Sequence, residues 1–480
     1  MTFGPPPSPF TQSRQAADAR AKRKALYLGG SAVVLALVLG LVAWVVWPSS
    51  EKAAPKVASQ GGGSGAPDDL RETVEKLPKQ GGAGHVEGAV VEQELAPGKT
   101  LIAPGMWATD KILAKGKASS LVAVNIDDGS NAWTTQLKGD ICAVSPDMTN
   151  DGRAAIAFTD PAGDHQCNQV MMFRVATGEK LWQVKIPVTQ GVFEEATTMT
   201  MTRGVVVTSW SRGSAGLDMA NGQTLWKRER TEKCKDGGFS GGRALLLRQD
   251  CFEKKERQDH FLVHKLDPRT GKIKWTYRVA PGVKFAYFLS SDPAVVAVEA
   301  GDFAVTNLLS LSDQGSLLTN IRMEGNHYKV ECNPDRVDRC DGAVVSKSQV
   351  FVTSGEASEQ LGNTTNWVVA FDLKTGRSGV KFDAGPDQQI SPIRMSGNRL
   401  LAMKFGTDTF APNSLISLDP KTGKQSPYFY FTIPAEVKGD GAEVAVQDGR
   451  LIIGHQEFKG TGKRSLPDAQ WLAYAVSAAD

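Results

Sequence analysis

The stretch LDPRTGKIKW, residues 266–275, is the clearest copy of a phrase that recurs along this chain. In each copy a Gly is followed four residues later by a Trp, as in NIDDGSNAW, FRVATGEKLW and LDMANGQTLW. The glycines of the four copies are Gly129, Gly178, Gly222 and Gly271, and the tryptophans are Trp133, Trp182, Trp226 and Trp275. An Asp or Asn shortly before a Gly is typical of a tight turn in which the Gly takes a positive φ.

Weaker copies of the phrase continue towards the C-terminus. Their glycines are Gly315, Gly376 and Gly423, and a degenerate eighth copy, WLAYAVSAAD, covers 471–480. Successive glycines are 49, 44, 49, 44, 61 and 47 residues apart. A period of this length is the sequence signature of a β-propeller, in which each repeat builds one blade of four strands.

Short apolar runs before each phrase supply the predicted strands. Examples are LVAVNI (121–126) and FLVHKL (261–266), and ICAVS (141–145) with RAAIAF (153–158) supplies two more strands in the second unit. Side chains alternate between the faces of a strand, so every Trp points to the same face of its blade. We therefore predict that the tryptophans fill the gaps between neighbouring sheets.

The expected domain is an all-β propeller over residues 85–480, which has room for eight blades of about 49 residues. Seven blades are the alternative, because the copies at 311–319 and 418–427 lack the Trp. The last unit lacks an outer strand of its own. We predict that GAVVEQEL (88–95) supplies this strand and so joins the two ends of the domain.

The phrase resembles the pyrroloquinoline-quinone-like (PQQ-like) β-propeller repeat, whose hallmark is ALD-x-x-TG-x-x-x-W. The best matches are LDPRTGKIKW, LDMANGQTLW and AFDLKTG (370–376). The resemblance implies the propeller fold, but the family contains both quinoprotein dehydrogenases and scaffold proteins such as the outer-membrane-assembly lipoprotein. The repeat of this chain is also similar to that of extracellular sensor domains of bacterial membrane proteins. The resemblance therefore implies a fold without fixing a function.

Residues 25–47 contain no charged side chain and are predicted to form one transmembrane helix. Twenty-three helical residues extend about 34 Å, which spans a bilayer core of about 30 Å. The preceding segment, 1–24, is basic, and the positive-inside rule places it in the cytoplasm and the propeller outside the plasma membrane. A cleaved signal peptide is the alternative, but its apolar core would be shorter and WPSSEK has no clear cleavage site.

Residues 48–84 form the expected flexible linker, because they are poor in apolar side chains and rich in Gly and Pro. Within this linker, DDLRETVEKL (68–77) has the composition of one or two helical turns. The net charge of the chain is +3, and the residues after 24 are nearly neutral. Nucleic-acid binding requires clustered Lys and Arg, so no nucleic-acid partner is expected.

Six cysteines follow the predicted anchor, which favours disulfides in an oxidising compartment over metal or redox chemistry. They are Cys142, Cys167, Cys234, Cys251, Cys332 and Cys340. Six cysteines allow fifteen pairings. Hairpin geometry would allow Cys142 to bridge Cys167 and Cys234 to bridge Cys251, and the last two cysteines bracket NPDRVDR in what resembles a pinned insertion, but the pairing stays open. We interpret this insertion, around 324–342, as a contact loop.

Other candidate chemical groups have plain structural interpretations. His260 and His264 share one face of a strand about 13 Å apart, too far for one metal ion. Asp335, Asp338 and Asp341 favour a solvated acidic loop over a calcium site, because their spacing is not that of an EF-hand. The adjacent Cys pair of quinoproteins is missing, and no calcium ligands or catalytic Asp can be assigned.

The sequence thus predicts a non-catalytic binding or scaffolding module at the cell envelope, with a protein or small-ligand partner on a propeller rim and no metal or cofactor. A quinone-dependent dehydrogenase, and a sensor signalling through a separate cytoplasmic protein, are the alternatives.

Overall fold

The computed structural model describes residues 66–77, 81–93, 95–162, 166–188, 197–253, 258–301, 304–323, 327–355, 365–407, 411–432, 442–460 and 469–478. The chain divides into two compact units, Met1–Gln60 and Gly61–Asp480. The first unit, with the predicted membrane helix at 25–47, lies outside the described residues. Within the described part of the chain there is no α-helix, and no helix that could cross a membrane.

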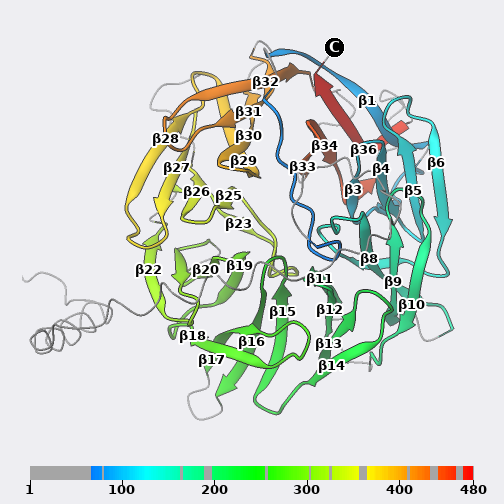
Figure 1. Cartoon of the computed structure of the whole chain (residues 1–480), viewed down its shortest axis with the longest axis vertical. Helices are drawn as coiled ribbons and strands as arrows, with labels where there is room; N and C mark the ends of the chain where they lie inside the picture. Colours follow the sequence, from blue (N-terminus) through cyan, green and yellow to red (C-terminus); the bar gives the residue numbers. More distant parts are fainter. Residues whose placement is uncertain are drawn as a thin grey trace, which may run out of the picture. The chain divides into compact units, whose positions relative to one another are not determined.

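Six four-stranded antiparallel sheets follow one another around a ring (Figure 1). The first three sheets are β3 (Met106–Ala108), β4 (Ile112–Lys117), β5 (Ser120–Asn125) and β6 (Asn131–Gln136); β7 (Ile141–Val144), β8 (Arg153–Asp160), β9 (Gln166–Arg174) and β10 (Lys180–Lys185); and β11 (Thr198–Thr202), β12 (Val205–Trp210), β13 (Gly213–Asp218) and β14 (Thr224–Glu229). The next three are β15 (Cys234–Ser240), β16 (Leu245–Glu253), β17 (Gln258–Leu266) and β18 (Ile273–Arg278); β19 (Phe285–Ser291), β20 (Ala294–Glu299), β21 (Asn307–Leu311) and β22 (Leu317–Arg322); and β25 (Ala343–Val345), β26 (Gln349–Thr353), β27 (Trp367–Asp372) and β28 (Ser378–Asp383).

The remaining long strands form one sheet of eight, in the order β29-β30-β31-β32-β1-β36-β34-β33. Its strands are β29 (Gln388–Ser396), β30 (Arg399–Gly406), β31 (Asn413–Leu418), β32 (Gln425–Phe431), β1 (Gly82–Gln93), β33 (Glu443–Gln447), β34 (Arg450–Gly454) and β36 (Ala469–Ala478). β1 pairs in parallel with β32 at only two positions, and then antiparallel with β36 from Gly84 to Gln93. The N-terminal strand thus supplies the outer strand of the C-terminal sheet, as the sequence predicted.

Two small two-stranded sheets complete the strands. β2 (Thr100–Ile102) pairs with β35 (Glu457–Lys459), and β23 (Glu331–Cys332) pairs with β24 (Cys340–Asp341). Buried apolar clusters lie between successive sheets, for example the cluster in which Trp107 of β3 packs with Phe173 of β9. The core of the ring is therefore a series of contacts between neighbouring sheets.

The recurring phrase forms the turn between the third and fourth strands of a sheet. In the copy at 266–275, Gly271 donates its backbone N–H to the carbonyl of Asp267 at 2.8 Å, and the Asp267 carboxylate accepts from the backbone and hydroxyl of Thr270. Gly271 has a φ of +66°, a conformation that residues with a Cβ resist. The Asp and Gly therefore fix the turn and with it the register of the fourth strand.

Each Trp of the phrase packs on the Gly of the next copy along the chain. A Cβ on Gly222 would lie 2.7 Å from the ring of Trp182, and one on Gly271 would lie 2.8 Å from the ring of Trp226. The indole N–H of Trp182 donates to the carbonyl of Met219, three residues before Gly222, at 2.9 Å. Trp133 and Gly178 repeat this arrangement. The phrase thus joins each sheet to the next.

Two expectations for segments outside the blades differ from the structure. Residues 66–77, expected within a flexible linker with a helical turn, run extended across the inside of the ring, because their charged side chains pair with the sheets (Figure 1). Within the insertion expected as a contact loop, the segment between Cys332 and Cys340 packs against the ring through Val337, which is 3% exposed. The apolar side chain of Val337 explains this packing, since it joins the cluster around Phe288.

Candidate functional site

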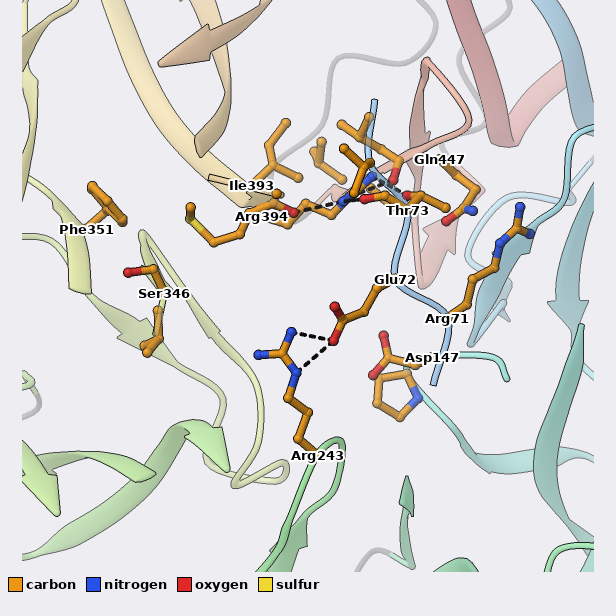
Figure 2. Close-up of a pocket in the computed structure, with 18 of the residues that line it drawn as sticks. Arg71, Glu72, Thr73, Asp147, Arg243, Ser346, Phe351, Ile393, Arg394 and Gln447 are labelled. Atoms are coloured by element: carbon orange, nitrogen blue, oxygen red, sulfur yellow. Dashed lines mark hydrogen bonds and ion pairs between the residues drawn. The ribbon is translucent and has the colours of Figure 1, made fainter. Parts of the chain in front are cut away.

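A cavity of about 750 Å³ lies inside the ring and is the candidate functional site (Figure 2). Its walls come from five of the large sheets and from residues 66–77, which we call the strap. β3, β29 and β33 contribute side chains directly, and the turns after β7, β15 and β25 contribute others. Propellers gather residues from many blades at their axis in this way, although those residues are far apart in sequence.

The strap crosses the turns that follow the innermost strands of several sheets. Its backbone pairs with the turn after β7, where Arg71 donates to the carbonyl of Met148 and Asn150 donates to the carbonyl of Asp69, both at 2.8 Å. Further along, the backbone N–H of Glu75 donates to the Ser396 hydroxyl at 2.8 Å. The strap therefore runs along the face of the ring that carries these turns, beside the cavity, and we call this place the channel mouth.

Ion pairs hold the strap at four places. Asp68 pairs with Arg153 of β8, Glu72 with Arg243 after β15, and Glu75 with Arg394 of β29. At the fourth place the strap supplies the cation, because Arg71 pairs with Asp448 after β33 at 2.6 Å. Glu75 is also bound by the backbone N–H of Gly449 at 2.6 Å. Figure 2 shows Glu72 of the strap pointing towards Arg243, with Arg394 further along the strap.

Asp147 is the acidic group of the cavity wall whose titration is most altered. It is an exposed residue of the cavity wall, and desolvation by the protein that surrounds the cavity raises its pKa to about 6, with the charge of Asp338 adding to the effect. Asp338 belongs to the hairpin between the last two cysteines, and burial raises its pKa too. The expected solvated acidic loop is therefore wrong for Asp338, whose side chain is 12% exposed and lies 3.6 Å from Arg336.

Lys115 of β4 is a buried cation that the sequence analysis did not identify. Its side chain is 0% exposed, and its Nζ has no hydrogen-bond partner among the described residues. Its pKa is lowered to about 8, chiefly by burial; the negative charge of Glu443 of the cavity wall opposes this effect, and the positive charge of Arg339 adds to it. No sequence signal marks this residue, because a Lys in an alternating strand is usually on the solvated face.

The structure settles the disulfide pairing, which is one that hairpin geometry allowed. The three disulfides join Cys142 to Cys167, Cys234 to Cys251 and Cys332 to Cys340. The first joins β7 to β9, the second joins the adjacent strands β15 and β16, and the third closes the hairpin of β23 and β24. All six cysteines are thus used, and each bridge is expected to stabilise the fold by about 2–4 kcal/mol.

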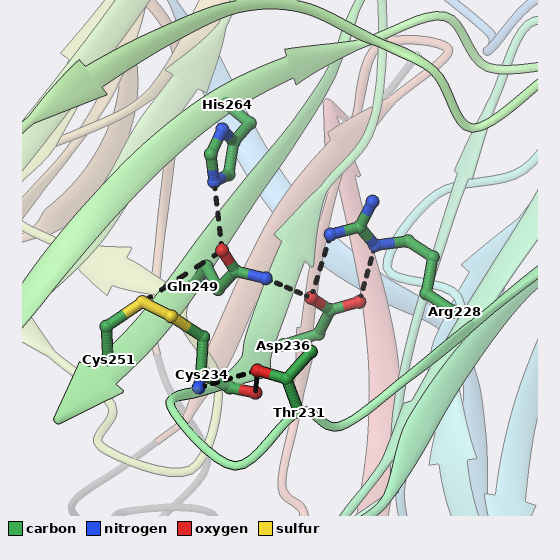
Figure 3. Close-up of a disulfide and its surroundings, with 7 residues drawn as sticks. All are labelled: Arg228, Thr231, Cys234, Asp236, Gln249, Cys251 and His264. Carbon is green, nitrogen blue, oxygen red and sulfur yellow. Dashed lines mark hydrogen bonds and ion pairs between the residues drawn. A yellow bond between two sulfur atoms is a disulfide. The ribbon is translucent and has the colours of Figure 1, made fainter.

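His264 of β17 lies in a polar network beside the second disulfide (Figure 3). The Gln249 amide N–H donates to Asp236 at 3.2 Å, and Asp236 also binds Arg228 at 2.8 Å. The amide oxygen of Gln249 then accepts from His264 Nε2 at 3.3 Å, so His264 Nδ1 accepts from the Thr276 hydroxyl at 2.8 Å. Burial lowers the pKa of His264 to about 4, which keeps the imidazole neutral. His264 is therefore a structural residue, as its spacing from His260 indicated.

The candidate residues of the sequence analysis fall into two groups. The tryptophans of the phrase and its glycines other than Gly129 lie at the joints between sheets, and none of them lines the cavity. The cavity is lined instead by Trp107, Asp147, Arg394 and the strap, none of which the sequence analysis named as part of a site. These residues escape detection because they stand one per blade, with no motif to link them.

The donor groups of the cavity do not fit the quinone and calcium of the dehydrogenases in this fold family. Calcium takes six to eight oxygen ligands. The carboxylates on the cavity wall are Glu72, Asp147 and Glu443, and the first is already paired with Arg243. Across the described ranges no three His, Cys, Asp or Glu side chains are grouped to hold a metal. The disulfides, moreover, each join cysteines that are at least eight residues apart rather than adjacent.

Part of the chain matches a known protein family, and solved structures resemble the chain distantly. The family model described as "Outer membrane protein assembly factor BamB" matches residues 86–237. No curated protein has a sequence that matches the chain. Among solved structures, BamB from Moraxella catarrhalis is 14% identical with a TM-score of 0.43, covering 81% of this chain and 98% of its own. A europium-containing methanol dehydrogenase is 12% identical with a TM-score of 0.46, covering 82% and 93%.

These structural similarities are too distant to carry an argument about activity. The stronger evidence is the steady repeat of the Gly and Trp phrase, the ring of four-stranded sheets and the family match over 86–237. On this evidence the chain is a PQQ-like β-propeller repeat protein.

Proposed function

We propose that this protein is a non-catalytic binding module, an eight-bladed propeller held at the outer face of the plasma membrane by one helix at 25–47. The sheet of eight strands supports the blade count, because only a two-residue parallel pairing joins its two halves, each of four strands. The charge-free segment 25–47 and the basic tail before it support the anchor and its orientation.

The observation that carries the proposal is the cavity inside the ring. Its volume of about 750 Å³ is that of a ligand site, and its walls mix apolar side chains such as Trp107 and Ile393 with charged ones such as Asp147 and Lys421. Rigid sheets position these groups, and the strap crosses the mouth of the same cavity. The arrangement supports recognition of a partner segment. The name of the matched family, an assembly factor, supports a protein as that partner.

Site-specific photo-crosslinking in intact cells tests this proposal. Lys421 and Lys374 occupy the same place in two copies of the turn, two residues before Gly423 and Gly376. Of these two lysines, only Lys421 lines the cavity. A photoreactive residue at 421 is expected to give a discrete adduct with a partner protein, and one at 374 is not. Equal adducts from both positions would contradict binding at the cavity.

A quinone titration of the purified full chain tests the absence of catalysis. We expect no saturable change in quinone absorbance with calcium present, and no dye reduction with alcohols or sugars. A saturable change accompanied by turnover would replace the binding module with a dehydrogenase.

A further inference from the structure

We propose that the channel mouth crossed by the strap is a binding site for an extended acidic segment of a partner protein, and that the strap occupies this site as an internal ligand. The inference rests on the proposed function and names the chemistry of the partner.

Three carboxylates of the strap meet three arginines that come from three different sheets. Glu72 accepts from Arg243 Nε at 2.7 Å, and Asp68 and Glu75 pair with Arg153 and Arg394. The acids stand at positions i, i+4 and i+7 of an extended chain. The arginines are therefore spaced along the channel mouth to receive a row of carboxylates, and Arg–carboxylate pairs are among the stronger charge-assisted contacts.

The arginines are positioned by the propeller itself. Arg153 Nε is held by Asp151 at 2.8 Å. Arg394 donates through Nε to the carbonyl of Val446 at 2.9 Å and through one terminal nitrogen to its neighbour Met395 at 2.8 Å. In both residues the second terminal nitrogen pairs with the strap carboxylate, and in Arg394 the first one also donates to the strap carbonyl of Thr73 at 2.8 Å. The site is thus preorganised, which lowers the cost of binding an acidic chain.

The charges of the wall and the strap are complementary. Apart from the strap, the cavity lining carries four basic side chains (Arg243, Lys347, Arg394 and Lys421) and two acidic ones (Asp147 and Glu443), a formal charge of +2. The strap over 66–77 carries four acidic and two basic side chains, a formal charge of −2. A partner segment must therefore be acidic to replace the strap.

The backbone of the strap shows how such a segment would be recognised. Its hydrogen bonds to the turn at 148–150 form an antiparallel bridge between Leu70 and Thr149. Addition of an extended peptide to exposed backbone groups is a common mode of recognition, in which side-chain contacts supply the specificity. Here the backbone contacts suit any extended chain, and the arginines select carboxylates.

The strap is weakly held by apolar contacts, which makes it exchangeable. Val74 is 64% exposed and Leu77 is 37% exposed, whereas Leu70 alone packs against a buried cluster. A segment whose only role was to tie the ring together would bury these side chains. Ion pairs with partly exposed members are screened by salt and replaceable by equivalent pairs. Covalent linkage keeps the strap at a high local concentration, so a partner segment must outcompete it.

Peptide binding to the full chain tests the inference. The probe is a fluorescent peptide with the strap sequence APDDLRETVEKL, and its control is the peptide in which Asp68, Glu72 and Glu75 are replaced by the corresponding amides. The protein variant D68N/E72Q/E75Q removes the charges of the resident strap. D140N/E229Q/E232Q makes the same change in charge at three exposed positions away from the channel.

Fluorescence anisotropy is expected to show that the acidic peptide binds the strap variant about ten-fold more tightly than it binds the parent or the control variant. The amide peptide is expected to bind the strap variant about ten-fold more weakly than the acidic peptide does, since it cannot pair with the arginines. Equal affinities for all proteins, or for both peptides, would overturn the inference. So would no binding to a strap variant that melts at the parent temperature.

The single variant Glu72→Gln keeps the test decisive if the triple variant does not fold. Glu72 and Arg243 are partly exposed, at 63% and 44%, so the fold should tolerate the loss of their pair. A rise of about three-fold in peptide affinity is expected, and an unchanged affinity would contradict the inference. A partner adduct at position 421 without peptide binding would reject the acidic ligand and keep the proposed function, whereas loss of both would reject the two together.

Discussion

At the residue scale, the phrase of Gly and Trp has a physical explanation that involves two neighbouring sheets. The Gly takes a positive φ within its own turn, and it also leaves the space that the Trp of the preceding copy fills. The same relation persists in weaker form where the Trp is replaced, because Gly376 faces Thr319 and Gly423 faces Val380. Turn chemistry and spacing alone were enough to place the tryptophans between sheets.

Replacing Gly222 by Ala separates the two roles of the glycine. An Ala at this position would have to adopt a positive φ, and its Cβ would lie 2.7 Å from the ring of Trp182. Gly129 is the matched control, since its φ is +69° and nothing lies within 4 Å of a Cβ there. We expect G129A to lower the free energy of unfolding by about 1 kcal/mol and G222A by about 2 kcal/mol more. Equal losses in denaturant unfolding would show that the Trp does not pack on the Gly.

The buried Lys115 predicts an effect of pH on stability. Because its pKa in the folded protein is lowered to about 8 from 10.5, its burial penalty is full below pH 8 and is relieved as the pH rises towards 10.5. Lys115→Met keeps the length of the side chain and removes the charge. It is expected to raise the free energy of unfolding at pH 7 by about 2 kcal/mol, and by less near pH 10. A less stable variant at pH 7 would mean that Lys115 has a favourable partner.

At the scale of elements, strands and turns follow from the sequence more readily than the segments between them. The apolar run predicted at 261–266 lies within β17, and that at 153–158 lies within β8. The strap could not be predicted, because its composition is that of a linker and its partners are single arginines on distant sheets. The packing of the hairpin at 331–341 was likewise decided by one apolar residue, Val337, in a polar loop.

Two Val→Ala substitutions compare the packing of the hairpin and the strap. Val337 is 3% exposed and its carbonyl accepts from the backbone N–H of Phe288 at 2.6 Å, whereas Val74 of the strap is 64% exposed. V337A is expected to lower the free energy of unfolding by about 1–2 kcal/mol, and V74A by less than about 0.5 kcal/mol. A loss of stability in V74A that matches V337A would contradict an exchangeable strap.

At the scale of the whole molecule, closure of the ring creates the cavity. β1 pairs with β36 over most of its length and brings the start of the ring to its end. The strap precedes β1 directly in sequence, so closure also brings the strap to the channel mouth. The sequence predicted this closure from a missing outer strand, but it could not predict the cavity, whose walls depend on the mutual placement of five sheets.

A designed disulfide between β1 and β36 tests the closed ring most directly. His85 and Ser477 are paired neighbours in the antiparallel register, so their side chains lie on the same face of the sheet. The six natural cysteines are already paired. Ala478 is next to Ser477 but points to the opposite face, which makes H85C/A478C the control.

The expected result is that mild oxidation links the new cysteines in H85C/S477C and not in H85C/A478C, as identified by mass spectrometry of the proteolysed protein. No link in the first variant, or equal links in both, would show that the ends of the chain do not meet in this register.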